Sequence, residues 1–259
     1  MNYLLIDLGY FLHFRYFATK SWYKRAKDYI NDERMKQDPI FQEILKKRVR
    51  ESIFKLVKDL NINHSNIIFC KDCKQSDIWR RSLFPNYKLN RKNLNNVKTE
   101  FCLIHEIIKN LTEIKLGSLL EHPKAEADDI VYCIRKYIKN HINKNAKFYI
   151  IASDNDYYQL CDENTYLKRL DKRNAMNNSL GNPDNDLLLK IIMGDKSDNI
   201  PSIKPKCGMK TALNLLKDPI LLDKLFKQDK TIKDRFDLNK QIIDMNNIPI
   251  EYKKTINHE

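Results

Sequence analysis

The sequence predicts an α/β protein with a mostly parallel, twisted central sheet and helices on both of its faces. Short apolar runs, typical of buried parallel strands, alternate along the chain with segments of helical periodicity. An acid comes after each of three such runs, namely Asp7, Asp72 and Asp154. Because open α/β sheets bind ligands at the carboxyl ends of their strands, these three acids are expected at one edge of the sheet.

The first half of the chain is expected to provide two strands and two helices. Residues 3–6 and 66–69 are the strand candidates, and the aromatic and basic residues 8–20 are expected to form a helix behind the first strand. Apolar positions between 40 and 60 recur about every 3.6 residues, which predicts a long amphipathic helix. Residues 21–38 are polar without a clear period and are predicted as a loop with a short helix.

Residues 74–123 differ in character, because basic, aromatic and asparagine residues dominate as far as Thr99. We expect this segment to project from the body as an insertion, with a helix over about 99–111. The elements that follow are expected to be a helix over 125–140, a strand over 147–152, a short helix to Cys161, a short strand near 166–167 and a helix over 184–193 with Pro183 at its start.

The last part of the chain is expected to be helical. Residues 200–217, which contain two prolines and Gly208, are predicted to form helix, turn and helix, and residues 218–259 a mixture of helix and loop. The chain of 259 residues is long enough for one globular domain, with 74–123 and 200–217 as elements within it.

The chain is strongly basic, with 47 lysines and arginines against 34 acids and a net charge of +13. Nine of the acids belong to the candidate site described below, and without them the remainder carries +22. A field of that sign attracts polyanions, which favours nucleic acid as the partner. A generic basic surface is the alternative that charge alone leaves open.

The six cysteines are scattered, and Cys70 and Cys73 form a lone CxxC pair without the second pair that a zinc site needs. We therefore expect free thiols and a reducing, intracellular compartment such as cytoplasm or nucleus. No signal peptide or membrane-spanning stretch is expected, because Asp7 interrupts the short apolar start.

Three acidic clusters lie within 73 residues: Glu126-Ala-Asp128-Asp129, Asp154-Asn-Asp156 and Asp195-Lys-Ser-Asp198. Each carboxylate raises the pKa of its neighbours, so such packing indicates a bound cation. Oxygen ligands favour Mg²⁺ or Mn²⁺. Together with the acids at the strand ends, the clusters exceed what one ion needs and match a site for two cations about 4 Å apart.

The chain resembles the 5′-nuclease family, which includes flap endonucleases, compact phage and viral 5′–3′ exonucleases, and the 5′-nuclease domain of bacterial DNA polymerase I. The resemblance covers residues 3 to about 216, with the motifs in the family's order. It rests on Leu5-Ile-Asp7, Phe84-Pro-Asn-Tyr87-Lys88-Leu-Asn-Arg91, Ala125-Glu126-Ala-Asp128-Asp129-Ile, Ser153-Asp154-Asn-Asp156-Tyr-Tyr-Gln159-Leu160 and Ile192-Met-Gly194-Asp195-Lys-Ser-Asp198-Asn199-Ile-Pro201.

The resemblance implies a PIN-like fold, two bound Mg²⁺ or Mn²⁺ ions and roles for particular residues. Asp128 is the better candidate for a direct ligand, and Asp129 is expected to act through water. The implied metal-binding acids are Asp7, Asp72, Glu126, Asp128, Asp129, Asp154, Asp156, Asp195 and Asp198.

The resemblance also implies that residues 74–123 hold a helical arch that threads a 5′ strand. At its base Lys88 and Arg91 would contact the scissile phosphate, and with Asp154 and Asp198 they are the implied catalytic residues. Lys and Arg stabilise charge on phosphoryl oxygens, and an aromatic such as Tyr87 can stack on a base. Further implied DNA contacts are Arg15, Arg80, Arg81 and Lys190.

Residues 200–217 resemble the element that grips duplex DNA and, in many family members, holds K⁺. The chain departs from the family's glycine pattern, since it is one residue longer there and keeps one glycine. Duplex contact is expected to persist, while K⁺ stays an open alternative. The implied contacts are Lys204, Lys206, Gly208, Lys210 and Thr211.

The leading hypothesis is a divalent-metal-dependent, structure-specific 5′-nuclease, a monomer acting on DNA with a 5′ flap, nick or 5′ end, or on RNA paired with DNA. The family's roles in DNA replication and repair are implied with it. No sliding-clamp motif is seen at the C-terminus. Two alternatives stay open: a non-catalytic DNA-binding member of the same fold, and a PIN-type RNA endonuclease.

Overall fold

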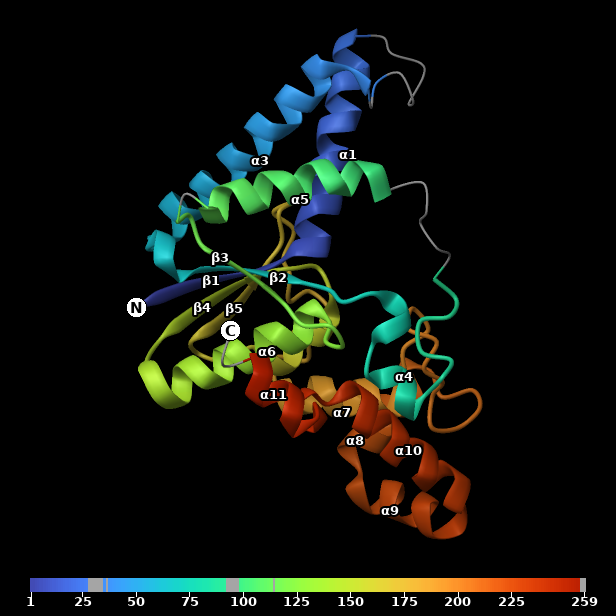
Figure 1. Ribbon diagram of the computed structural model, residues 1–259. Coiled ribbons are helices and arrows are strands. Elements are labelled where there is room, and N and C mark those ends of the chain that lie inside the picture. The colour runs from blue at the N-terminus through green and yellow to red at the C-terminus, as the bar shows by residue number, and fades with distance from the viewer. Residues whose placement is uncertain (28–34, 36, 92–97, 114, 257–259) are drawn as a thin grey trace.

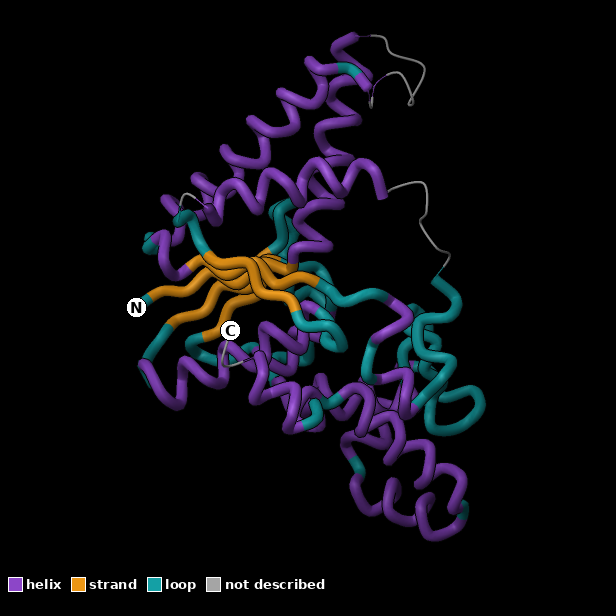
Figure 2. Tube along the Cα trace, in the orientation of Figure 1, coloured by secondary structure: helices purple, strands orange, loops and turns teal. Residues whose placement is uncertain are grey.

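A five-stranded parallel sheet forms the centre of the protein (Figures 1 and 2). The computed structural model describes residues 1–27, 35, 37–91, 98–113 and 115–256. The strand order is β3-β2-β1-β4-β5, and every neighbouring pair is parallel. The predicted α/β class with a parallel sheet is thus confirmed. The strands are β1 (Asn2–Asp7), β2 (Ile67–Lys71), β3 (Ser118–Glu121), β4 (Lys147–Ile151) and β5 (Thr165–Lys168).

Three helices cover one face of the sheet, and buried apolar side chains such as Phe11, Phe41 and Phe69 fill the space between. They are α1 (Leu8–Lys27), α3 (Pro39–Leu60) and α5 (Lys98–Glu113). The predicted helix over 40–60 is confirmed. Asp38 caps α3 by accepting a hydrogen bond from the amide of Ile40, and Pro39 stands at its first position.

The opposite face is covered by α6 (Ala127–Tyr137), which continues as a π-helical turn (Ile138–Ile142), and by α11 (Ile250–Ile256) beside it. Ile130 and Phe148 are fully buried between this layer and the sheet. Four further helices extend the fold below the sheet in Figure 1: α7 (Pro183–Met193), α8 (Met209–Lys217), α9 (Pro219–Gln228) and α10 (Lys230–Ile243).

Short elements connect these layers. They are the single-turn helix α4 (Arg80–Leu83) and the 3₁₀ helices His64–Asn66, Gln75–Asp77, Asn155–Leu160 and Met245–Asn247. Among the described cysteines, each side chain is a free thiol. No helix in the described part of the chain is long and apolar enough to cross a membrane.

The predicted loop over 21–38 is wrong in its first part, since α1 continues to Lys27. The reason is tertiary: Tyr23 is buried and packs edge-on against Phe41 of α3, with ring centroids 5.4 Å apart. This contact between distant segments gives no periodic signal within 21–38. Residues 28–34 and 36 lie outside the described part.

The expectation that residues 74–123 project from the body is wrong for much of that segment. Helix α5 buries Ile107 and Ile108 in the core, and β3 joins the sheet beside β2. Gly117 precedes β3 with φ +87°, where a Cβ would lie 2.8 Å from the carbonyl oxygen of Ile67. Residues 92–97 of the expected arch lie outside the described part.

Residues 200–217 contain one helix rather than the two predicted. Pro201 and Pro205 lack an amide hydrogen and interrupt any helix before Met209. The preceding segment is a loop fastened to α7 by a hydrogen bond from the amide of Ile203 to the carbonyl of Ile192. Helices α7 and α8 therefore flank this loop.

The strand ends meet at one edge of the sheet. Asp7 is in register with Cys70, and Ile6 is in register with both Phe69 and Ile151. The segments that leave β1, β2 and β4 therefore begin side by side, as the positions of the three acids predicted.

The backbone conformation of Gly194, in the turn that carries Asp195, gives a prediction about stability. Its φ is +68°, and a Cβ there would lie 2.4 Å from the carbonyl oxygen of Ile200. We expect Gly194→Ser to lower the free energy of unfolding by about 1–3 kcal/mol, because both strain and collision oppose the side chain. The measurement is urea unfolding at equilibrium. The matched control is Gly208→Ser, where a Cβ meets nothing within 4 Å and serine suits the N-cap of α8; equal losses would contradict the explanation.

Candidate active site

Five predicted carboxylates converge on one cavity of about 420 Å³ at the carboxyl edge of the sheet. They come from different elements, and the basic side chains Lys88 and Arg91 line the same cavity. The five are Asp7, Asp72, Glu126, Asp128 and Asp154. The structure therefore brings together acids that are up to 147 positions apart in the sequence.

The junction between β1 and α1 places Asp7. The amide of Tyr10 donates to Asp7 Oδ1 over 3.0 Å, and the hydroxyl of Tyr157 donates to Oδ2 over 3.0 Å. Gly9 allows the second acid to come close, since a Cβ there would lie 3.1 Å from Asp72 Oδ2 and 3.5 Å from Asp7 Oδ1. Any larger residue would crowd this pair of carboxylates.

The start of α6 places the next group of acids. Glu126 is the N-cap residue, and the Asp129 side chain accepts a hydrogen bond from the Glu126 amide over 3.0 Å, as in a capping box. Asp72 accepts a hydrogen bond from the amide of Ala127 over 2.8 Å. The positive end of the helix thus offsets part of the negative charge.

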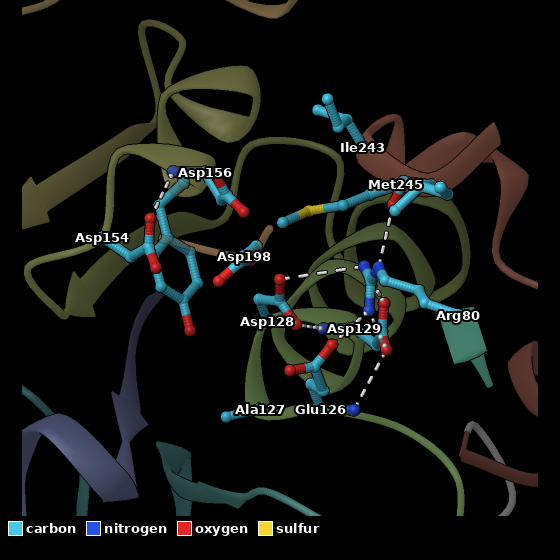
Figure 3. Close-up of polar contacts among 12 residues, drawn as sticks. Arg80, Glu126, Ala127, Asp128, Asp129, Asp154, Asp156, Asp198, Ile243 and Met245 are labelled. Atoms are coloured by element: carbon cyan, nitrogen blue, oxygen red, sulfur yellow. Dashed lines mark hydrogen bonds and ion pairs between the residues drawn. The ribbon is translucent and has the colours of Figure 1, made fainter. Parts of the chain in front are cut away.

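Asp129 and Arg80 form a buried pair, which corrects the DNA contact predicted for Arg80 (Figure 3). The guanidinium donates from Nη1 and Nη2 to the two Asp129 oxygens over 2.9 and 2.7 Å, and Trp79 Nε1 adds a third bond of 2.9 Å. Asp129 is fully buried and Arg80 is 2% exposed. Arg80 therefore has no surface to offer DNA. Single carboxylate oxygens of Asp129, Glu126 and Asp128 lie within 4.8 Å of one another, so the metal role of Asp129 stays a prediction.

The pKa values separate the acids for which basic partners outweigh burial from those for which burial prevails, and Asp128, 3.8 Å from Arg80 Nη2, belongs to the second kind. Burial, followed by repulsion from Asp72, raises the pKa of Asp7 to about 7. Burial also raises the pKa of Asp72 and of Asp128. For Glu126, Lys88 and Arg80 outweigh the effect of burial and lower the pKa. A cation between Asp7, Asp72 and Asp128 would remove the repulsion.

The segment 84–91 folds over the acids. Tyr87 is buried, and its hydroxyl donates to Glu126 over 3.0 Å and to Asp198 over 3.2 Å. The stacking role predicted for Tyr87 therefore does not fit its position. Lys88 forms an ion pair with Glu126 and lies 3.5 Å from Asp198, while Arg91 pairs with Asp198 and remains partly exposed.

A second acidic group lies beside the first. Single carboxylate oxygens of Asp156, Asp195 and Asp198 lie within 4.8 Å of one another. Lys190 of α7 forms ion pairs with Asp156 and, over 2.8 Å, with Asp195. Lys190 and the Ser197 donors outweigh burial and lower the pKa of Asp195 to about 2.

Asp195 of the second group lines a larger cavity of about 1180 Å³, and Asp154 lines both cavities. Lys206 and Gly208 also line the larger one. Lys210 is exposed at the start of α8, and Lys204 and Thr211 are half-buried nearby. Arg81 of α4 lies beside the segment that carries Lys88, where its Nε donates to the carbonyl of Tyr87 over 3.1 Å. The DNA contacts of these residues stay predictions.

The donor set fits hard divalent cations. The first cavity is lined by carboxylate oxygens, without thiolates. Histidine contributes through His13, which stands at its rim on α1. Oxygen-rich, negatively charged sites of this kind favour Mg²⁺ or Mn²⁺.

Residues 2–182 match the family model described as 5′-3′ exonuclease, N-terminal resolvase-like domain. The chain belongs to the 5′-3′ exonuclease family. A 5′-3′ exonuclease of Mycoplasmopsis pulmonis is 30% identical over 235 residues, which cover 87% of this chain and 69% of that protein. Ribonuclease H of enterobacteria phage T4 is 29% identical over 158 residues, covering 58% of this chain and 50% of that protein.

Solved structures of the T5 D15 protein share the fold. The D15 protein co-crystallised with metal ions aligns with a TM-score of 0.69 at 17% identity, covering 100% of this chain and 97% of that one. The D15 flap endonuclease in a complex with DNA and metal ions aligns with a TM-score of 0.68 at 14% identity, with the same coverage.

Two residues of this 5′-3′ exonuclease family member were missed by sequence reasoning. Tyr157 lies in a segment that was singled out, but its hydroxyl contact with Asp7 depends on the pairing of β1 with β4. Gly9 follows Asp7 by two positions. A glycine that close to an acid at a strand end is a signal for close approach, and it could have been used.

The buried Arg80 gives a prediction about stability. Arg80→Leu leaves Asp129 without its cation, so the free energy of unfolding should fall by about 3–5 kcal/mol. Arg81→Leu, one position away, removes only one hydrogen bond to a backbone carbonyl and should cost about 1 kcal/mol. Equilibrium unfolding in urea measures both, and similar losses for the two variants would argue against the structural role of Arg80.

The raised pKa values of the acids give a prediction about metal. Adding Mg²⁺ or Mn²⁺ to EDTA-treated protein should stabilise it, by about 2.7 kcal/mol at a hundredfold excess over the dissociation constant. Asp128→Asn should reduce this gain because it removes a ligand charge. Thermal unfolding with and without metal measures the effect. Asp237→Asn, which changes an exposed i,i+4 pair with Lys233, is the control and should keep the full gain.

Proposed function

We propose that the chain is a divalent-metal-dependent, structure-specific 5′-nuclease that hydrolyses phosphodiesters of DNA at 5′ ends, nicks or flap junctions. The carrying observation is the convergence of five carboxylates and two cations, Lys88 and Arg91, on one cavity. The two acidic groups fit two Mg²⁺ or Mn²⁺ ions, and Asp154 lines the cavities on both sides. RNA paired with DNA is included among the substrates.

The chain's own residues would hold and orient the reacting phosphate. Bound metal would supply an activated water and neutralise charge on the phosphate. Asp7, Asp72 and Asp128 would hold the ion of the first cavity, and Asp156 and Asp195 would hold an ion at the second acidic group. Lys88 and Arg91 pair with Glu126 and Asp198 and line the same cavity, so they are placed to contact the phosphoryl oxygens of a substrate bound there.

The larger cavity supports a duplex-binding role for the segment between α7 and α8. Lys206 and Lys210 are exposed there, and the exposed Gly208 leaves the start of α8 open to a phosphate. A duplex held at this position would present its 5′ end to Asp154, which lines both cavities. A K⁺ site in this segment is not part of the proposal.

Cleavage by two variants tests the mechanism. Asp154→Ala and Asp198→Ala should each lower the cleavage rate of a 5′-labelled flap at least a thousandfold, because each removes charge at the junction of the two acidic groups. Binding of the same flap in EDTA should persist. Rates are measured by gel at saturating Mg²⁺ and again with EDTA, and undiminished cleavage by both variants would refute the mechanism.

The same experiment separates the two alternatives. A non-catalytic DNA-binding protein would bind the flap and leave it intact with Mg²⁺ and with Mn²⁺. A PIN-type RNA endonuclease would cut an RNA strand in preference to a DNA flap of the same sequence in one competition. Asp237→Ala is the control and should cleave as the unmodified protein does, since Asp237 lies on α10 in an exposed pair.

A further inference from the structure

Tyr157 brings a phenol hydroxyl into the wall of the first cavity. Its side chain is fully buried, and it lines the cavity together with Asp7, Asp72 and Asp128. The hydroxyl donates a hydrogen bond to Asp7 Oδ2 over 3.0 Å. Phenylalanine would fill the same space without this contact, so packing alone does not require a hydroxyl at this position. The hydroxyl instead lies where it can act on a carboxylate that the proposed mechanism assigns to a metal ion.

Two donors together fix the orientation of the Asp7 carboxylate. The amide of Tyr10 donates to Oδ1 and the hydroxyl of Tyr157 donates to Oδ2, each over 3.0 Å. Each carboxylate oxygen has about two lone-pair sites, so one site on each oxygen stays available to a cation. Without the Tyr157 hydroxyl, the carboxylate would keep one of these donors and could rotate about its last side-chain torsion, which has only broad preferences.

The element that carries Tyr157 is itself held in place. Tyr157 follows Asp156 directly in the 3₁₀ helix Asn155–Leu160. Gln159 of the same helix accepts a hydrogen bond from the amide of Met245 over 3.0 Å. The helix is thereby fastened to the segment that follows α10, so the hydroxyl is presented from a fixed position. One element therefore carries Asp156 of the second acidic group and holds an acid of the first cavity.

The neighbouring tyrosine has an equivalent hydrogen bond away from the acids. Tyr158 is 5% exposed, and its hydroxyl donates to the backbone carbonyl of Ala175 over 2.8 Å. Both tyrosines are therefore buried, lie on one 3₁₀ helix and satisfy their hydroxyls within the chain. The difference is the acceptor, which is a carboxylate of the first cavity for Tyr157 and a peptide group for Tyr158. This pair separates the loss of a hydrogen bond from an effect on the metal site.

We propose that Tyr157 is a positioning residue that acts through Asp7, holding this carboxylate in the orientation that binds a divalent cation in the first cavity. Hydrogen-bond partners of metal ligands orient those ligands, and their removal typically lowers metal affinity about 10- to 100-fold. The inference rests on the proposed nuclease function, because it takes the first cavity as the place of an ion. It adds that the affinity for this ion depends on a neutral side chain that is not itself a ligand.

Binding of Mn²⁺ to metal-free protein, measured without DNA from the electron paramagnetic resonance signal of free Mn²⁺, tests the proposal. Tyr157→Phe removes only the hydroxyl and should weaken one Mn²⁺ about 10- to 100-fold. Asp7→Asn identifies this ion as that of the first cavity. Adding Tyr157→Phe to Asp7→Asn should weaken binding little further, because the hydroxyl acts through Asp7. The matched control is Tyr158→Phe, which should bind Mn²⁺ as the unmodified protein does.

Cleavage of a labelled 5′ flap over a range of Mg²⁺ concentrations gives a second measurement. For Tyr157→Phe the Mg²⁺ concentration at half-maximal rate should rise by a similar factor, and excess Mg²⁺ should restore most of the rate because every carboxylate remains. For Tyr158→Phe that concentration should not change. Each variant loses one buried hydrogen bond, so both should lower the midpoint of urea unfolding by similar amounts. A merely structural role of Tyr157 would move the two variants together in every measurement.

An unchanged Mn²⁺ affinity in Tyr157→Phe would overturn the positioning role while leaving the nuclease function standing. An equal loss of affinity in Tyr158→Phe would do the same, since it would trace the effect to the fold rather than to Asp7. Unmodified protein that binds no Mn²⁺ and leaves the flap intact would overturn both the positioning role and the proposed function.

Discussion

The buried pair of Arg80 and Asp129 is the interaction on which the site depends. It joins three parts of the chain, because Arg80 also donates to Glu126 and, through Nε, to the carbonyl of Ile242 at the end of α10. Burying a guanidinium and a carboxylate is costly unless nearly every donor and acceptor is satisfied, and here they are. The pair therefore fixes the start of α6, which carries Glu126 and Asp128, against the segment that carries Lys88.

The other acids of the site differ in whether a lysine or arginine of the chain forms an ion pair with them. Glu126 and Asp198 have Lys88 and Arg91, and Asp195 has Lys190. Asp7 and Asp72 have only hydrogen-bond donors, and repulsion adds to burial in raising their pKa values. A folded protein keeps such an arrangement when a ligand supplies the missing positive charge. The arrangement thus links the stability of the fold to metal binding.

The sequence was sufficient where the signal is local. The helix over 39–60, four of the strands and the placement of Asp7, Asp72 and Asp154 follow from periodicity and burial along short segments. It was insufficient where contacts between residues far apart in the sequence determine whether a segment is a strand or a side chain is buried. Edge strand β3 has two apolar residues, and its position follows from pairing with β2. Arg80 and Arg91 belong to one basic segment, and only packing shows that the first is buried and the second reaches the cavity.

The adjacent acids Asp128 and Asp129 on α6 also show that the sequence pattern alone does not reveal which partner each side chain contacts. Asp128 and Asp129 differ by one position, and a helix turns about 100° per residue, so the two side chains leave it in different directions. Asp128 lines the cavity and lies 3.8 Å from Arg80 Nη2, whereas Asp129 is fully buried against Arg80 and Trp79. A pattern of acids therefore predicts that a metal site exists, but the division between ligands and structural partners requires knowing which cations are buried beside them. In a chain with this excess of positive charge, the cations nearest to the acids determine which carboxylates remain available to metal.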